Sequence, residues 1–205
     1  MDHDNDNDTN KDKNLVSSMG NHIYFYTDVN QNSALEIIKL IRKLTSEILV
    51  KKALNYSDDI YNDSQDTDTS VCTSPIYLHI NSNGGNYFDG MAIVDTIRLN
   101  KVAIYTIAEG EVASMASIIF LAGKKKFINE NSYILIHEIR SSISGTFSNI
   151  KDEFENCKLL MDKMIKYYKD NTSIPKKELD TILKKDLLID SEKCIKWKMA
   201  NKIIK

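Results

Sequence analysis

Apolar and polar residues follow two different periods through the central part of the chain. Short runs rich in β-branched and aromatic residues predict strands, and stretches with an apolar residue every three or four positions predict helices. The expected strands span residues 22–27, 76–80, 102–110, 125–128 and 133–139, and the expected helices span residues 33–49, 89–100, 113–123, 150–168, 176–186 and 190–200. Ser33 and Asp190 are the expected N-caps of the first and last helices. Because strands alternate with helices, we expect an α/β domain built on a largely parallel sheet.

Two acidic stretches interrupt this pattern. Residues 1–20 and residues 51–74 each contain five Asp and two Lys, and they hold few apolar side chains. Segments of this composition bury too little apolar surface to offset the entropy that ordering removes. We therefore expect a disordered acidic tail over 1–20 and a disordered surface loop over 51–74, within an otherwise single domain at 21–205.

The composition is that of an ordinary globular chain. The 205 residues are enough for one domain of usual size, and the net charge of -2 excludes a generally basic nucleic-acid-binding surface. No apolar run reaches the roughly 18 residues of a transmembrane helix, and residues 1–20 lack the apolar stretch of a secretory signal. Cys72, Cys157 and Cys194 lie far apart without metal-ligand spacing, which indicates free thiols in a reducing compartment. We therefore expect a cytoplasmic protein that binds neither membrane nor nucleic acid.

The few glycines cluster where a ligand site is expected. Of seven glycines, four lie at the ends of the two central strands or at the starts of the helices that follow them: Gly84, Gly85, Gly90 and Gly110. Ligands of open α/β sheets bind at the carboxyl ends of the strands, and glycine there permits tight turns or close backbone approach. The same glycines are compatible with plain turns, so their distribution alone leaves both interpretations open.

Three side chains near these strand ends could carry chemistry. Ser114 follows a short turn expected at 109–112 and opens an apolar helix, where unpaired N–H groups would stabilise negative charge on a reacting oxygen. His137 ends an apolar strand, and Asp186 lies between two late helices. Each residue also has a structural explanation when taken alone: a helix cap for Ser114, a half-buried core ring for His137 and a solvated charge for Asp186.

Several short motifs follow one another along the chain. A strand ends in I-N-S-N-G-G at 80–85, a helix reads G-M-A-I-V-D-T-I at 90–97, a turn reads G-E-V-A-S-M at 110–115, and a strand ends in I-H at 136–137. Their order and spacing resemble the proteolytic subunit of the Clp protease family, whose motifs read I-N-S-x-G-G, G-x-A-I-x-D-T-I and G-x-x-A-S-M. The resemblance covers about residues 22–50 and 75–205 and includes a late segment that contains Asp186.

The resemblance implies a fold and a set of catalytic roles. The fold would be the Clp-protease/crotonase-like α/β fold of repeated β-β-α units, with the helix at 150–168 as a protruding handle. Ser114 would be the nucleophile, His137 the general base and then acid, and Asp186 the group that orients the imidazole. The backbone amides of Gly85 and Met115 would form the oxyanion hole. The chain would then be an ATP-dependent serine endopeptidase that hydrolyses peptide bonds of unfolded proteins.

The same resemblance implies partners. Family members form heptameric rings, stacked as a tetradecamer that encloses the sites, and an AAA+ unfoldase feeds them unfolded polypeptide. ATP would bind that partner, because this chain contains no G-x-x-x-x-G-K-[ST] loop. No cofactor and no metal ion are expected in the chain itself.

Several positions depart from the family's motifs. Asn83 stands where a proline is usual before the glycine pair, Glu138-Ile139 stand where Gln-Pro is usual after the histidine, and Ser141-Ser142 stand where a glycine pair is usual. The chain therefore resembles a divergent, phage-like or viral-like member. These departures leave two alternatives open: a catalytically inactive ring subunit, and a crotonase-type acyl-CoA enzyme that would use the oxyanion hole without a triad.

Overall fold

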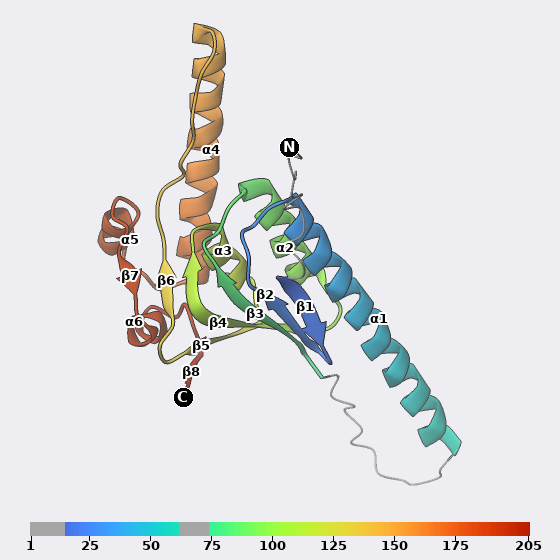
Figure 1. The fold of residues 1–205 in the computed structure, drawn as a ribbon. Coiled ribbons are helices and arrows are strands. Elements are labelled where there is room, and N and C mark those ends of the chain that lie inside the picture. The colour runs from blue at the N-terminus through green and yellow to red at the C-terminus, as the bar shows by residue number, and fades with distance from the viewer. Residues whose placement is uncertain (1–14, 62–73) are drawn as a thin grey trace, which may run out of the picture.

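The computed structural model describes residues 15–61 and 74–205 as a mixed α/β fold (Figure 1). The strands are β1 Val16–Met19, β2 His22–Phe25, β3 Ile76–Ser82, β4 Ile104–Ala113, β5 Lys125–Asn129, β6 Tyr133–Leu135, β7 Leu188–Ile189 and β8 Lys202–Ile204. The helices are α1 Gln31–Tyr61, α2 Tyr87–Leu99, α3 Met115–Leu121, α4 Phe147–Asn171, α5 Lys176–Ile182 and α6 Ser191–Lys196. The strands and helices that the sequence predicts are present, so the α/β prediction is confirmed. Residues 1–14 and 62–73, which hold much of the expected tail and loop, lie outside the described residues.

Parallel pairing dominates the sheet. The strand order is β1-β2-β3-β4-β5-β8, in which β1 pairs antiparallel with β2 and each later neighbour pairs parallel. The long strand β4 changes partner along its length, because residues 105–108 pair with β5 and residues 111–113 pair with β6. Gly110 lies between these two segments with φ 63°, a conformation that glycine adopts without strain. As a result β6 joins the carboxyl end of β4, and β7 pairs antiparallel with β6.

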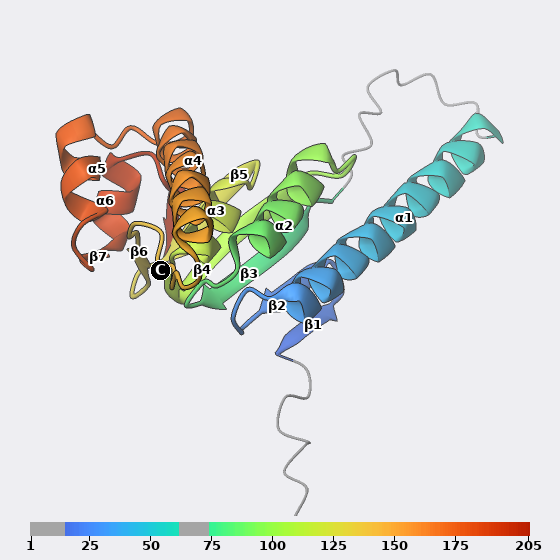
Figure 2. The ribbon, with the colours of Figure 1, turned by 90° about the horizontal axis from the view of Figure 1, so that it is seen from above.

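Helices α1, α2 and α3 lie side by side over one face of the sheet (Figure 2). Every residue of α3 is buried, as its apolar sequence predicts. Helix α4 rises from this layer and projects beyond the rest of the domain (Figure 1), so the expected protruding handle is present. Its base is fixed to α3, because the buried Tyr168 hydroxyl shares a 2.7 Å hydrogen bond with Ser117 Oγ and the Tyr167 hydroxyl donates to the Ile118 carbonyl at 3.1 Å.

Three predictions for residues 15–61 are wrong. Residues 16–19, which the sequence places in a disordered tail, form the edge strand β1, whose backbone is paired with β2. Helix α1 continues to Tyr61, so residues 51–61 are helical rather than part of the expected surface loop. Asn30, and not Ser33, caps α1, because the Asn30 side chain accepts hydrogen bonds from the amides two and three residues further on, both at 3.0 Å. Asp190 does cap α6, as expected, by accepting from the Lys193 amide at 2.8 Å.

Cys157 and Cys194 are free thiols, as their spacing predicts, and Cys72 lies outside the described residues. Burial, with the nearby Asp190 as a second cause, raises the pKa of the Cys194 thiol to about 12. In the described part of the chain, no helix combines the length and the apolar character needed to cross a membrane. Residues 15–61 and 74–205 also contain no group of three or more His, Cys, Asp or Glu side chains placed to hold a metal ion.

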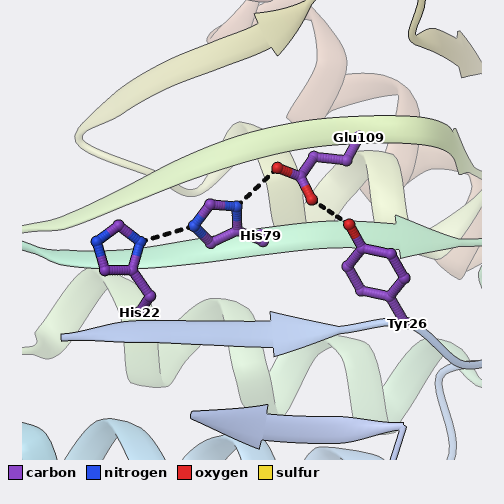
Figure 3. A network of polar contacts seen from close by, with 4 residues as sticks. All are labelled: His22, Tyr26, His79 and Glu109. Carbon is purple, nitrogen blue, oxygen red and sulfur yellow. Dashed lines mark hydrogen bonds and ion pairs between the residues drawn. The ribbon is translucent and has the colours of Figure 1, made fainter. Parts of the chain in front are cut away.

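A chain of polar contacts crosses the face of the sheet that is turned away from the helices (Figure 3). His22 on β2 faces His79 on β3, with 2.8 Å between His22 Nδ1 and His79 Nε2. His79 Nδ1 lies 2.8 Å from Glu109 Oε1 on β4, and the Tyr26 hydroxyl donates to the other carboxylate oxygen of Glu109. Burial first, and the bond to Glu109 second, raise the pKa of Tyr26 to about 12. These contacts tie β2, β3 and β4 together by side chains as well as by backbone.

Candidate active site

Ser114 makes the change of direction between β4 and α3. The strand runs to Ala113, so the expected turn at 109–112 is strand, and Ser114 itself has φ 54° and ψ -124°, a strained conformation for a residue with a Cβ. Hydrogen bonds hold it on both sides: its amide donates to the Leu135 carbonyl at 2.8 Å, and its carbonyl accepts from the Ser117 amide at 3.0 Å and from Ser117 Oγ at 2.7 Å. The Ser114 side chain makes no capping hydrogen bond to α3, so capping is not what it does here.

The Gly84-Gly85 turn after β3 packs directly against Ser114. Gly84 has φ +94° and Gly85 has φ +144°, and a Cβ on Gly84 would lie 2.6 Å from Ser114 Cβ. A Cβ on Gly85 would overlap the Val29 carbonyl group. The Val29 amide donates to the Gly84 carbonyl at 2.7 Å, which fixes the turn from the side of the loop before α1. Close backbone approach, rather than a plain turn, therefore explains this glycine pair.

Ser114 opens into a cleft of about 470 Å³ that lies between the strand ends, α3 and α4. Gly85, Met115 and His137 line the same cleft, so the structure brings together four of the five expected site residues. His137 follows β6 and is half-buried. Strand β4 brings Ser114 and His137 into the same cleft. Its last residues lead into Ser114 and also pair with β6, which His137 follows.

The cleft also has an apolar side. It is lined there by Ile118 of α3 and by Leu160 and Met164 of α4. Ile118 and Met164 are buried, with 1% and 6% of their surface exposed. Pockets of this kind, apolar with a few convergent polar groups, are typical of ligand sites.

Asp186, the fifth expected residue, does not line the cleft and is not bonded to His137. Its side chain lies before β7, is 57% exposed, and accepts a hydrogen bond from the Arg140 guanidinium at 2.6 Å. His137 Nδ1 lies instead 2.6 Å from the Glu138 carbonyl oxygen. The structure therefore brings Ser114 and His137 into one cleft but leaves Asp186 beside Arg140 at its margin.

Arg140 and Val29 are among the residues at the site that were not predicted from the sequence. Arg140 is one of only three arginines in the chain and lies three positions after His137, a signal that could have identified it as a charged neighbour of the site. Val29, which holds the Gly84-Gly85 turn, gives no such signal. Its backbone hydrogen bonds to the turn form when the chain folds.

Strained serine turns between a strand and a helix occur in α/β hydrolases. The Ser114 turn and the histidine in its cleft are accordingly compatible with a hydrolase. A sequence model of the Clp protease family matches residues 46–205 of this chain. The chain belongs to the Clp protease family, and the resemblance noted from its motifs is confirmed.

Curated relatives agree with the family assignment. The chain is similar to an ATP-dependent Clp protease proteolytic subunit 2 from Treponema denticola, with 35% identity over 135 residues, which are 65% of this chain and 68% of the relative. It is also similar to an ATP-dependent Clp protease proteolytic subunit from Deinococcus radiodurans, with 28% identity over 131 residues, which are 63% of this chain and 64% of the relative. The aligned part therefore spans about two thirds of these relatives, at modest identity.

Proposed function

We propose that this chain is a serine endopeptidase of the Clp proteolytic-subunit type, with Ser114 as the nucleophile and His137 as the general base. The observation that carries the proposal is the shared cleft, where the strained Ser114 turn, the backbone of Gly85 and Met115, and the His137 ring converge. Family membership supports peptide-bond hydrolysis as the reaction. Asp186 completes the proposed triad.

In the proposed reaction the Ser114 oxygen attacks the scissile carbonyl carbon while His137 takes the hydroxyl proton. The amides of Gly85 and Met115 receive the oxyanion; Met115 is the first residue of α3, so its amide has no partner within the helix. His137 then protonates the leaving amine, which departs and leaves an acyl ester on Ser114. Water attacks the ester with His137 again as the base, which releases the acid product and restores the hydroxyl.

The proposed substrate is an unfolded polypeptide in extended conformation. Its main chain would run beside Gly85 and Ile139, which both line the cleft. The apolar side formed by Ile118, Leu160 and Met164 favours an apolar substrate side chain next to the scissile bond.

We also propose that the chain works as heptameric rings, stacked as a tetradecamer and fed by an AAA+ unfoldase in the cytoplasm. ATP would be used by that partner, and this chain would need no cofactor or metal ion of its own. The form of α4 supports stacking, because it projects beyond the domain (Figure 1) and exposes large apolar side chains. These are Phe147, Ile150, Phe154 and Leu159, which are 83%, 43%, 59% and 55% exposed.

Hydrolysis of an unfolded protein substrate by the assembled chain and its unfoldase tests the proposal. Ser114→Ala should lower turnover at least about a thousandfold, because the nucleophile is removed. Ser144→Ala is a matched control at an exposed serine that does not line the cleft, and it should keep wild-type turnover. Unchanged turnover in Ser114→Ala would refute the proposal, and no turnover by the wild-type assembly would favour an inactive ring subunit.

A further inference from the structure

The acid expected behind His137 is paired with an arginine. Arg140 Nη2 donates to Asp186 Oδ2 at 2.6 Å, and His137 Nδ1 lies 2.6 Å from the Glu138 carbonyl oxygen. Arg140 also lines the cleft that contains His137. The carboxylate and the imidazole thus each have a partner other than the one that a triad requires.

The backbone nevertheless brings the segments that carry Asp186 and His137 side by side. Strands β6 and β7 pair antiparallel with Leu135 opposite Leu188. His137 and Asp186 each lie two residues from this pair, just beyond the end of the ladder. A 2.9 Å hydrogen bond from the Glu138 amide to the Leu183 carbonyl keeps the two segments together beyond the paired residues, although it departs from the register of the ladder. The carboxylate is therefore bonded to a guanidinium and belongs to the segment beside the one that carries the imidazole.

We propose that Arg140 is a positioning residue that competes with His137 for Asp186 and so sets how often the triad is assembled. This inference rests on the proposed function, because it concerns the same site. When Asp186 pairs with Arg140, the Nδ1–H of His137 donates to the neutral Glu138 carbonyl. When Asp186 turns to His137, the same N–H donates to a carboxylate, which stabilises the imidazolium that forms as Ser114 loses its proton.

The competition is between contacts of similar, small strength. The side chains of Arg140 and Asp186 are 68% and 57% exposed, so water and salt compensate much of their attraction. Removing the guanidinium should therefore raise the assembled fraction by only about two- to fivefold. A pair this weak can give way to His137 when substrate enters the cleft.

A double-mutant cycle on the full chain measures the competition. The readout is the rate at which a neutral fluorophosphonate probe labels Ser114, followed by intact mass. Arg140→Gln should label about two- to fivefold faster than wild type, and Arg140→Lys, which keeps the charge, should label more slowly than Arg140→Gln. In the Asp186→Asn background, Arg140→Gln should change nothing, because the contested carboxylate is gone. Added salt should accelerate wild type but not Arg140→Gln.

Lys166→Gln is the matched control. It removes the cation of another exposed ion pair, in which Lys166 Nζ lies 2.7 Å from Asp170 Oδ2 on α4 and outside the cleft, and it should label at the wild-type rate. An Arg140→Gln rate at or below wild type overturns the inference, and so does equal acceleration in the Asp186→Asn background. If no variant shows labelling that Ser114→Ala abolishes, the proposed function fails. If Ser114 is labelled at a rate that does not change when Arg140 is substituted, this inference is overturned and the proposed function stands.

Discussion

At the scale of single residues, the site depends on backbone conformations that the motifs only partly predict. The glycine pair after β3 and the serine before α3 could be identified from sequence, because both lie where strands end. The contact between Gly84 and Ser114 could not be predicted from the sequence, because it depends on how β3 and β4 pair. The Arg140–Asp186 ion pair could not be predicted either, because it joins exposed side chains 46 positions apart in the chain.

Gly84→Ala tests how closely the glycine turn must approach the serine. Residue 84 has φ +94°, which strains any residue with a side chain. The new Cβ would also lie 2.6 Å from Ser114 Cβ, so either the turn or the serine must shift. We expect a loss of about 1–3 kcal/mol in the free energy of unfolding and a drop in peptide hydrolysis of about a hundredfold. Urea unfolding and steady-state hydrolysis measure the two effects.

Gly20→Ala is the control for backbone strain alone. Gly20 has φ +60°, and no atom lies within 4 Å of where its Cβ would be. This variant should lose about 1 kcal/mol of stability and keep wild-type hydrolysis. Equal hydrolysis by Gly84→Ala and Gly20→Ala would show that the turn does not position Ser114.

At the scale of elements, the sequence predicts the central strands and helices well and fails where apolar patterning is weak. Strand β1 has one buried residue in four, Val16, and forms because its backbone pairs with β2. Helix α1 continues beyond the residues whose apolar spacing predicts a helix. Residues 51–54 (Lys, Lys, Ala, Leu) are good helix formers, and they extend a helix that packing has already nucleated. The switch of β4 between β5 and β6 also escaped prediction, although the glycine at its centre marks the place.

The histidine contact between β2 and β3 predicts an acid-sensitive sheet (Figure 3). One of the two facing nitrogens must donate and the other accept, so a second proton breaks the contact. Burial first, and the neighbouring His79 second, lower the pKa of His22 below its ordinary value of 6.5. The unfolded chain therefore takes up this proton at a higher pH than the folded chain does. Stability from this group is present above pH 6.5 and is lost as the pH falls below it.

Urea unfolding of wild type and His22→Gln at a series of pH values checks this prediction. Glutamine does not titrate, so the variant should lose less stability than wild type between about pH 7.5 and pH 5.5. Carboxylates elsewhere contribute equally to both chains and cancel in the comparison. An equal or larger loss in His22→Gln would contradict the assignment.

At the scale of the whole molecule, the candidate site is a product of the complete fold. The cleft takes residues from the turn after β3, the turn after β4, the segment after β6 and helix α4. The order of motifs predicts this architecture because three of the four motifs lie at the carboxyl ends of strands β3, β4 and β6. The exposed apolar residues of α4 are the feature that supports the proposed contacts between subunits.

We propose that folding makes Ser114 a nucleophile beside His137. Mapping the residue that a fluorophosphonate probe modifies is the most direct test of this proposal. In the folded chain we expect one adduct, on the peptide that contains Ser114. The adduct should be absent in denaturant, and it should form at least about a hundredfold more slowly in His137→Gln. An adduct on another residue, or an undiminished rate in His137→Gln, would contradict the account.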